Sequence, residues 1–163
     1  MTASPAVLIL GAGVSGLCMG IQLLRAGISS FTILEKSDRV GGTWYDNQYP
    51  GAACDVPSHF YCYSFEPNPD WSMVFAGRAE IQRYIRGVAD KHDLIGRTRF
   101  ATRVLSARYD EAEGLWWLTL DDGTASRYGW ATRPTLAVRV EGQSRYPDGQ
   151  GAGIPSEARG LRW

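Results

Sequence analysis

Cysteine and histidine are scarce in this sequence of 163 residues. There are three cysteines, Cys18, Cys54 and Cys62, with no C-x-x-C pair, and two histidines, His59 and His92. An odd number of cysteines at this spacing indicates a reducing compartment rather than a disulfide framework. No set of histidines and cysteines has the spacing of metal ligands, so we predict no metal site.

Excess charge and long apolar runs are also missing. Lysine and arginine number 17 and are balanced by 17 aspartates and glutamates, so no net field would draw the protein to nucleic acid or to an anionic membrane. The N-terminal segment has no basic region, and its apolar run is too short for a signal peptide or a membrane span. We therefore expect a cytoplasmic protein that acts on a small molecule; the oligomeric state stays open.

A strand, a glycine turn and a helix follow one another at the N-terminus. Residues 6–10 form a continuous apolar run, which is typical of a central parallel strand. GAGVSG follows at 11–16, and from Val14 the apolar residues recur at helical spacing until Gly27. A second strand at 31–35 completes a βαβ unit. This pattern predicts an α/β fold with a parallel sheet of the Rossmann type.

The glycine motif predicts a nucleotide site. Gly11 would allow a tight turn, Gly13 would let the backbone approach a pyrophosphate, and Gly16 would let the helix pack closely on the strand. Glu35 ends the second strand 19 residues after Gly16, where a carboxylate can bind the ribose hydroxyls and disfavour a 2′-phosphate. The motif favours FAD or NAD over NADP without choosing between them. The alternative is a glycine-rich turn that binds nothing.

The middle of the chain combines a long loop with regular elements. Residues 36–77 are rich in Gly, Pro, Asn, Asp and aromatic residues, and the aromatics argue against disorder, so we expect a loop ordered around a ligand. An amphipathic helix is predicted at 78–94. Two strands are predicted at about 98–109 and 115–120, ahead of a DDG turn at 121–123, which together indicate a small β-meander.

Several motifs in the long loop make the resemblance specific. After Glu35 the chain carries Gly41-Gly42-Thr43-Trp44, NQYPGAACD at 47–55 and Tyr63-Ser64-Phe65. Residues 6 to about 123 resemble the class B flavin-dependent monooxygenases, above all the Baeyer–Villiger monooxygenases. The stretches AACDVPSH, NPDW and EIQRYI resemble that ketone-oxidising branch more than the flavin-containing monooxygenases of the eukaryotic type.

The resemblance implies FAD as cofactor and a role for each matching residue. Asp55 would be catalytic, lying close to the isoalloxazine and the nicotinamide and orienting an arginine. The implied cofactor-binding residues, besides Asp55, are Gly11, Gly13 and Gly16 at the pyrophosphate, Glu35 at the ribose, Gly42, Thr43 and Trp44 toward the flavin, Tyr61 near the ring, and Val104 at the adenine.

Each of these residues also has a structural alternative. Trp44, Tyr49 and Tyr61 can be core aromatics, as most aromatic residues are. Asp55 can be a helix N-cap for the residues that follow it. Cys54 and Cys62 can be small buried apolar residues, and His59 a hydrogen-bonded structural residue.

The family activity implied by the resemblance uses NADPH and O₂ to convert a ketone to an ester or lactone. Many members have Trp, Arg and Arg where this chain has Asp46, Gln48 and Ala53, which leaves the substrate range open. Alternatives to this function are a non-catalytic nucleotide-binding remnant and a flavin monooxygenase that acts on N or S atoms.

The sequence changes character after Thr124. Residues 125–163 are rich in Arg, Gly, Pro and Ser, with one strand-like piece at 135–140, and lack the A-T-G turn, the F-x-G-x-x-x-H fingerprint and the second glycine motif of the family. The NADPH site and the active-site arginine belong to those missing motifs. We therefore predict two parts, an incomplete FAD-binding domain at 1–124 and an atypical tail at 125–163, either divergent and disordered or translated out of frame. Such a chain would not be competent alone.

Overall fold

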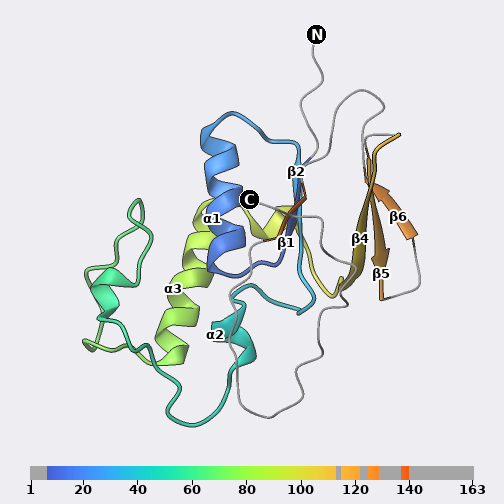
Figure 1. Ribbon diagram of the computed structural model, residues 1–163. Helices are drawn as coiled ribbons and strands as arrows, with labels where there is room; N and C mark the ends of the chain where they lie inside the picture. Colours follow the sequence, from blue (N-terminus) through green and yellow to red (C-terminus); the bar gives the residue numbers. More distant parts are fainter. Residues whose placement is uncertain (1–6, 113–114, 122–124, 129–136, 140–163) are drawn as a thin grey trace.

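A parallel sheet forms the centre of the molecule. The computed structural model describes residues 7–112, 115–121, 125–128 and 137–139. Its parallel strands are β1 (Val7–Leu10), β2 (Phe31–Leu34), β3 (Thr98–Arg99) and β7 (Ala137–Arg139), in the order β3-β2-β1-β7. The helix α1 (Val14–Arg25) connects β1 to β2 (Figure 1). The predicted βαβ unit and the α/β fold class are confirmed.

The end of α1 follows the prediction from sequence. Ala26 is the C-cap, and Gly27 then takes a φ of +75°, a left-handed conformation that glycine adopts without steric cost. The N–H groups of Gly27 and Ile28 donate to the carbonyls of Leu24 and Leu23 at 3.0 and 2.8 Å. These bonds satisfy carbonyls of the last helical turn.

The two faces of the parallel sheet are covered by different elements. Ile9 and Ile33 are fully buried in a cluster with apolar residues of α1 and of α3 (Arg78–Lys91). Leu8 and Leu34, which point to the opposite face, belong to a cluster with Leu118 and Leu120. These two leucines lie in a second, antiparallel sheet, described below. Figure 1 shows α1 and α3 on one side and that sheet on the other. Burial on both faces explains why the first strand has no polar alternation.

The second sheet is the predicted antiparallel meander, in the order β4-β5-β6. It consists of β4 (Val104–Asp110), β5 (Leu115–Leu120) and β6 (Ala125–Tyr128). The single strand expected at 98–109 was wrong, because β3 and β4 belong to different sheets. Between them Ala101 has a φ of +48°, which no strand residue can have, and the chain turns there.

The long loop is ordered, as predicted, but it contains two short helices that the sequence did not indicate. These are α2 (Thr43–Asp46) and the 3₁₀ helix η1 (Ser58–Phe60), while a second 3₁₀ turn, η2 (Ile95–Arg97), follows α3. Tyr63 and Trp71 anchor the loop in the helix-side core. No helix within the described ranges is long and apolar enough to cross a membrane.

Two of the strands that the structure describes lie beyond residue 124. β6 completes the meander, and β7, inside the strand-like segment predicted at 135–140, pairs in parallel with β1. A strand next to β1 on the side away from β2 continues the sheet in the order of a doubly wound fold. The rest of the predicted tail lies outside the described residues, so the division at residue 124 stays a prediction.

Candidate functional site

Two glycines of the first glycine segment, residues 11–16, cannot carry a side chain without strain, Gly11 because of its backbone conformation and Gly16 because of close packing. Gly11 has a φ of +95°, and its N–H donates to the Leu34 carbonyl at 2.8 Å, which fixes the turn at the end of β1. A Cβ at Gly16 would lie 1.9 Å from the Gly11 carbonyl oxygen. The tight turn and the close helix packing predicted for these residues are both present.

A second glycine segment, Gly41–Trp44, lies directly against the first. The Gly41 N–H donates to the Ala12 carbonyl at 2.9 Å, and a Cβ at Gly42 would lie 3.0 Å from the Cα of Gly13. Gly42 is also the N-cap of α2 and has a φ of +53°. Two glycine backbones, far apart in sequence, thus meet at the N-terminus of α1.

The start of α1 is chemically suited to an anion. The N-cap is Gly13, which has no side chain to cap the first N–H groups, and the first turn holds no acidic residue. The first N–H groups of a helix have no partner within it, and they carry a partial positive charge. A phosphate can therefore bind at this helix end, where glycines leave the backbone accessible.

Glu35 lies beside this helix end and is almost completely buried, with 3% of its surface exposed. One carboxylate oxygen accepts a hydrogen bond from the Ala12 N–H at 2.6 Å, and the other accepts one from the Ser37 N–H at 2.9 Å. The carboxylate therefore ties the first glycine segment to the end of β2. Each oxygen keeps a further lone pair, so these bonds leave acceptor capacity for ribose hydroxyls.

Trp44 and Tyr61, both predicted to lie near a flavin, contact each other. The Trp44 indole N–H donates to the Tyr61 hydroxyl at 3.0 Å, and the rings meet edge to face with centroids 5.6 Å apart. Thr43 precedes Trp44 in α2 and is partly buried. The structure thus brings together residues from two parts of the long loop beside the second glycine segment.

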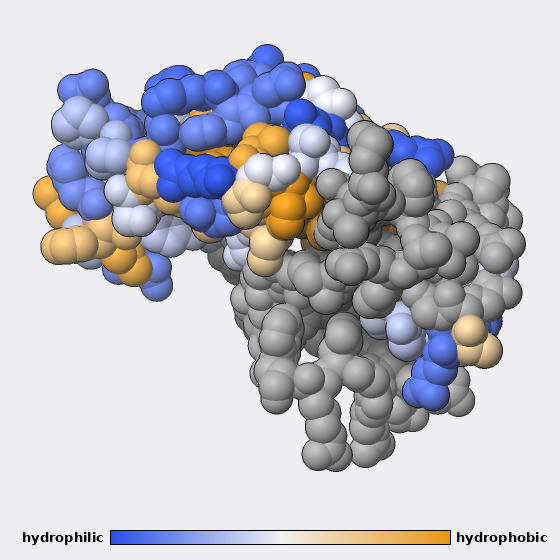
Figure 2. Space-filling model, turned by 90° about the horizontal axis from the view of Figure 1, so that it is seen from above, coloured by the Kyte–Doolittle hydropathy of each residue, from blue (hydrophilic) through white to orange (hydrophobic). Residues whose placement is uncertain are grey.

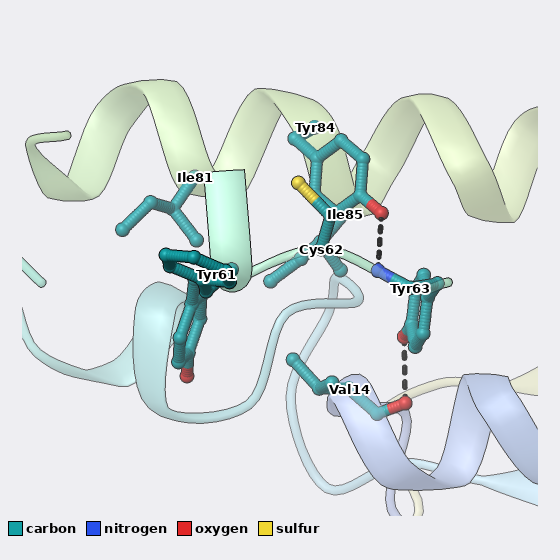
Figure 3. A pocket seen from close by; sticks show the side chains of 8 residues that line it. Val14, Tyr61, Cys62, Tyr63, Ile81, Tyr84 and Ile85 are labelled. Carbon is teal, nitrogen blue, oxygen red and sulfur yellow. Dashed lines mark hydrogen bonds between the residues drawn. The ribbon is translucent and has the colours of Figure 1, made fainter. Parts of the chain in front are cut away.

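A cavity of about 230 Å³ opens between α1, η1 and α3 (Figure 3). The Tyr63 hydroxyl donates to the Val14 carbonyl at 2.6 Å. The Tyr84 hydroxyl accepts from the Tyr63 N–H at 2.9 Å and donates to the Glu66 carbonyl at 2.8 Å. The lining residues are Val14, Phe60, Tyr61, Cys62, Tyr63, Ile81, Tyr84 and Ile85.

Two tyrosine hydroxyls of this cavity, those of Tyr63 and Tyr84, are strongly desolvated. Desolvation raises the pKa of Tyr84 to about 12 and raises the pKa of Tyr63 further above its ordinary value. Both hydroxyls stay protonated at neutral pH, as they would at the ordinary pKa of tyrosine, and the raised pKa extends their donor roles to higher pH. They link α3 to the first residue of α1.

The remaining predicted site residues lie at the edges of this arrangement. Val104 begins β4, two residues after Thr102, whose N–H donates to the Glu35 carbonyl at 2.9 Å. Asp55 is exposed in the long loop, after Cys54, whose N–H donates to the Ala76 carbonyl. The alternative that Asp55 caps a helix is wrong, because η1 begins after Pro57 and no side chain caps it.

The cysteines and histidines serve packing and hydrogen bonding. The three cysteines are free, and Cys54 is buried in the core, as expected for a small apolar residue. Cys62 accepts a hydrogen bond from the Trp71 indole at 3.2 Å, and His59 lies 3.4 Å from the Pro69 carbonyl oxygen. Within the described ranges no three His, Cys, Asp or Glu residues are grouped to hold a metal ion.

Two polar residues of α3 hold the second glycine segment, and the sequence analysis assigned neither of them to the site. Gln82 donates to the Val40 carbonyl at 2.6 Å, and Arg78 donates to the Trp44 carbonyl at 2.9 Å. The acceptors are backbone carbonyls more than thirty positions away, and any residue type supplies such a carbonyl. The sequence signal was only that both residues lie on one helix, four positions apart.

Comparisons with known proteins agree with this geometry. Residues 9–77 match the family model described as an NAD(P)-binding Rossmann-like domain. An uncharacterised monooxygenase of Mycobacterium tuberculosis is 52% identical over 122 residues, which is 75% of this chain and 24% of that protein. A Baeyer–Villiger monooxygenase of Streptomyces coelicolor is 43% identical over 118 residues, which is 72% of this chain and 23% of that protein.

A solved structure extends the likeness to most of the chain. The crystal structure of OTEMO in complex with FAD and NADP is similar with a TM-score of 0.76 at 33% identity, covering 93% of this chain and 29% of that one. The chain thus spans about a quarter of the length of the curated relatives it matches.

Proposed function

Because the chain is homologous to the N-terminal FAD-binding part of the Baeyer–Villiger, or class B flavin, monooxygenases, we propose that it is the FAD-binding portion of such an enzyme. The observation that carries this proposal is the meeting of the two glycine segments beside Glu35 at the N-terminus of α1. An adenine dinucleotide needs this combination of a phosphate-accepting helix end and a ribose-accepting carboxylate.

The residues present fit FAD. The glycine contact at the N-terminus of α1 leaves a cradle without side chains, which suits a pyrophosphate. Bound FAD would supply the redox chemistry, taking a hydride from NADPH and activating O₂ for insertion into a ketone. The residues proposed to hold it are Gly11, Gly13, Gly16 and Gly42 at the pyrophosphate, Glu35 at the ribose, Val104 toward the adenine, and Thr43, Trp44 and Tyr61 toward the flavin.

Each polar group proposed for binding has a task that its position supports. The first N–H groups of α1 donate to phosphate oxygens, and Glu35 accepts from ribose hydroxyls while its charge disfavours a 2′-phosphate. Trp44 and Tyr61, fixed to each other by a hydrogen bond, offer a rigid apolar wall that excludes water. Asp55 is exposed, so its carboxylate is accessible, as the role proposed for it toward NADPH and an arginine requires.

We further propose that the long loop packs against further sequence of the enzyme of which this chain would be the FAD-binding portion. The long loop exposes Phe60, Met73 and Val74 with exposed fractions of 82, 58 and 63%. Ser58 holds the chain near Phe60 against the chain at Met73 and Val74, because its N–H donates to the Val74 carbonyl and its hydroxyl donates to the Met73 carbonyl. Figure 2 shows apolar surface over this loop, at the left. Exposed apolar patches mark interaction surfaces.

The same proposal has three further parts. They are the division into an FAD part at 1–124 and an atypical tail at 125–163, a cytoplasmic location, and the use of NADPH and a ketone. The support for the ketone is the Baeyer–Villiger type of the relatives. The missing NADPH motifs support the view that turnover needs sequence beyond this chain.

The absorption spectrum of the purified protein tests the proposal. We expect oxidised flavin bands between about 370 and 450 nm after reconstitution with FAD and removal of free cofactor. We also expect saturable FAD binding with no NADPH oxidation by the chain alone. NADPH-dependent oxygenation of a ketone by this chain would contradict the proposed dependence on further sequence.

A second candidate is a non-catalytic remnant that binds nucleotides weakly or not at all. It is favoured by Glu35, whose two oxygens already accept backbone hydrogen bonds and which is 3% exposed. A colourless protein whose melting temperature does not rise with FAD would support this candidate over the first.

A further inference from the structure

One face of α3 clamps the second glycine segment at both of its ends. Gln82 donates from Nε2 to the Val40 carbonyl at 2.6 Å, just before the glycine pair. Arg78 donates from Nε to the Trp44 carbonyl at 2.9 Å and from Nη2 to the Tyr45 carbonyl at 3.3 Å, just after the pair. Residues four apart on a helix share a face, so the two side chains act on the segment together.

The pair Gly41 and Gly42 lies between the carbonyls held by these two side chains of α3, Arg78 and Gln82, which we call the α3 clamp. A Cβ at Gly41 would lie 2.0 Å from Oε1 of Gln82, so the glutamine amide packs directly on the Gly41 backbone. Gly41 and Gly42 have φ values of +134° and +53°, which glycine adopts without steric cost but which its unrestricted backbone can also leave. The Gln82 contact therefore holds a backbone shape that the local sequence does not enforce.

The clamped segment is the one that reaches the first glycine segment. The Gly41 N–H bonds the Ala12 carbonyl, and Gly42 lies against Gly13. The carbonyls held by α3 and the backbone that approaches the helix end thus belong to one short stretch of chain. A shift of that stretch would open the contact between the two glycine segments.

Gln82 also carries a buried polar atom that lowers the stability of the fold. Its Oε1 is buried and accepts no hydrogen bond from the part of the chain that the structure describes. A buried acceptor without a partner destabilises the fold, whereas an apolar side chain of equal length would not carry this penalty. The favourable contribution of the Gln82 amide therefore comes from its NH₂ group, which donates to the Val40 carbonyl.

We propose that Arg78 and Gln82 are positioning residues that hold the second glycine segment, Gly41–Trp44, in the shape that binds FAD. The inference rests on the proposed function, because the segment it positions is proposed to lie against the pyrophosphate and the flavin. Neither residue is proposed to touch the cofactor; both act through backbone carbonyls.

The first test uses the protein without any ligand. Gln82→Met and Arg78→Met keep the length of the side chain and remove the donors, and Arg83→Met, on an exposed position of the same helix, is the matched control. We expect faster amide hydrogen exchange at residues 41–47 in the two test variants, with unchanged exchange in β1 and α1. Unchanged exchange at 41–47 would overturn the positioning role whether or not the protein binds FAD.

The second test compares two ligands of the same site. In the proposed site FAD would span both glycine segments, whereas AMP, which has one phosphate and no flavin, would lie at Glu35 and the first glycine segment. Loss of one hydrogen bond in Gln82→Met is expected to weaken FAD binding about fivefold, and loss of two in Arg78→Met about tenfold, while AMP binding stays unchanged. Arg78→Lys, which retains one charged donor, should restore part of the FAD affinity.

The outcomes separate the inference from the proposed function. Equal loss of FAD and AMP binding would show a general folding defect and overturn the positioning role. Failure of the unmodified chain to bind FAD would overturn the proposed function, and the exchange experiment would still decide whether α3 holds the segment.

Discussion

The two glycine segments meet at one point but are held there in different ways. The first is fixed within the βαβ unit that contains it, because Gly16 packs on Gly11 and Gly11 bonds the adjacent strand β2. The second is fixed from a distance by side chains of α3, more than thirty residues further along the chain. The shape of the first segment follows from its own glycines and the adjacent strand, so both the motif and its physical role can be predicted from sequence. The shape of the second segment depends on a distant helix, so that segment can be recognised only by resemblance to known proteins.

The largest effect is expected from the locally fixed segment. Gly16→Ala places a Cβ 1.9 Å from a backbone oxygen, and backbone cannot move aside as a flexible side chain can. We expect a loss of about 3 kcal/mol or more in the free energy of unfolding, together with loss of FAD binding, measured by urea denaturation and by flavin titration.

Gly87→Ala is the matched control for that substitution. Gly87 lies inside α3 with nothing within 4 Å of an added Cβ. Alanine there should raise the stability by about 0.5 to 1 kcal/mol, because it is a better helix former than glycine. Equal losses in both variants would show that glycine content, and not close packing, decides the stability of the first segment.

The fold was largely predictable because its signals are local. The apolar run before Gly11, the helical spacing from Val14 and the acidic residue at the end of β2 predicted the βαβ unit with nearly the observed bounds. The strand predicted at 98–109 failed, because the left-handed turn at Ala101 depends on its N–H bonding the Ser37 carbonyl, a contact between distant segments.

The glycines of the site and Glu35 could be predicted from the sequence, but the side chains that hold the long loop in place could not. Ser58 joins two parts of the long loop by bonding backbone carbonyls, and Tyr63 and Gln82 likewise bond carbonyls of Val14 and Val40. Carbonyls carry no sequence information, so such partners cannot be found without coordinates. The resemblance supplied the chemistry of the loop, and the structure supplied what holds it.

A smaller effect is expected at the carboxylate between the two segments. Glu35→Gln keeps the size of the side chain but retains only one acceptor oxygen for the N–H groups of Ala12 and Ser37. One buried donor then faces an NH₂ group, so the free energy of unfolding should fall by about 2 kcal/mol in urea denaturation.

The control for Glu35 is Glu80→Gln at the surface. Glu80 also accepts two hydrogen bonds, from the N–H and hydroxyl of Ser72, and these bonds lower the pKa of its carboxyl. Water can replace them in the variant, so its stability should fall less than that of Glu35→Gln. A loss at Glu80 as large as that at Glu35 would mean that burial does not set the cost.

The smallest effect is expected at the end of the second segment, where one hydrogen bond joins Trp44 to Tyr61. Trp44→Phe and Tyr61→Phe each remove one partner and keep an aromatic ring in place, so each should cost about 1 kcal/mol of stability. The double variant should cost less than the sum, with a coupling of about 1 kcal/mol in a double-mutant cycle followed by urea denaturation. Additive losses would show that the two aromatics are independent core residues and that the far end of the second segment depends on the α3 clamp alone.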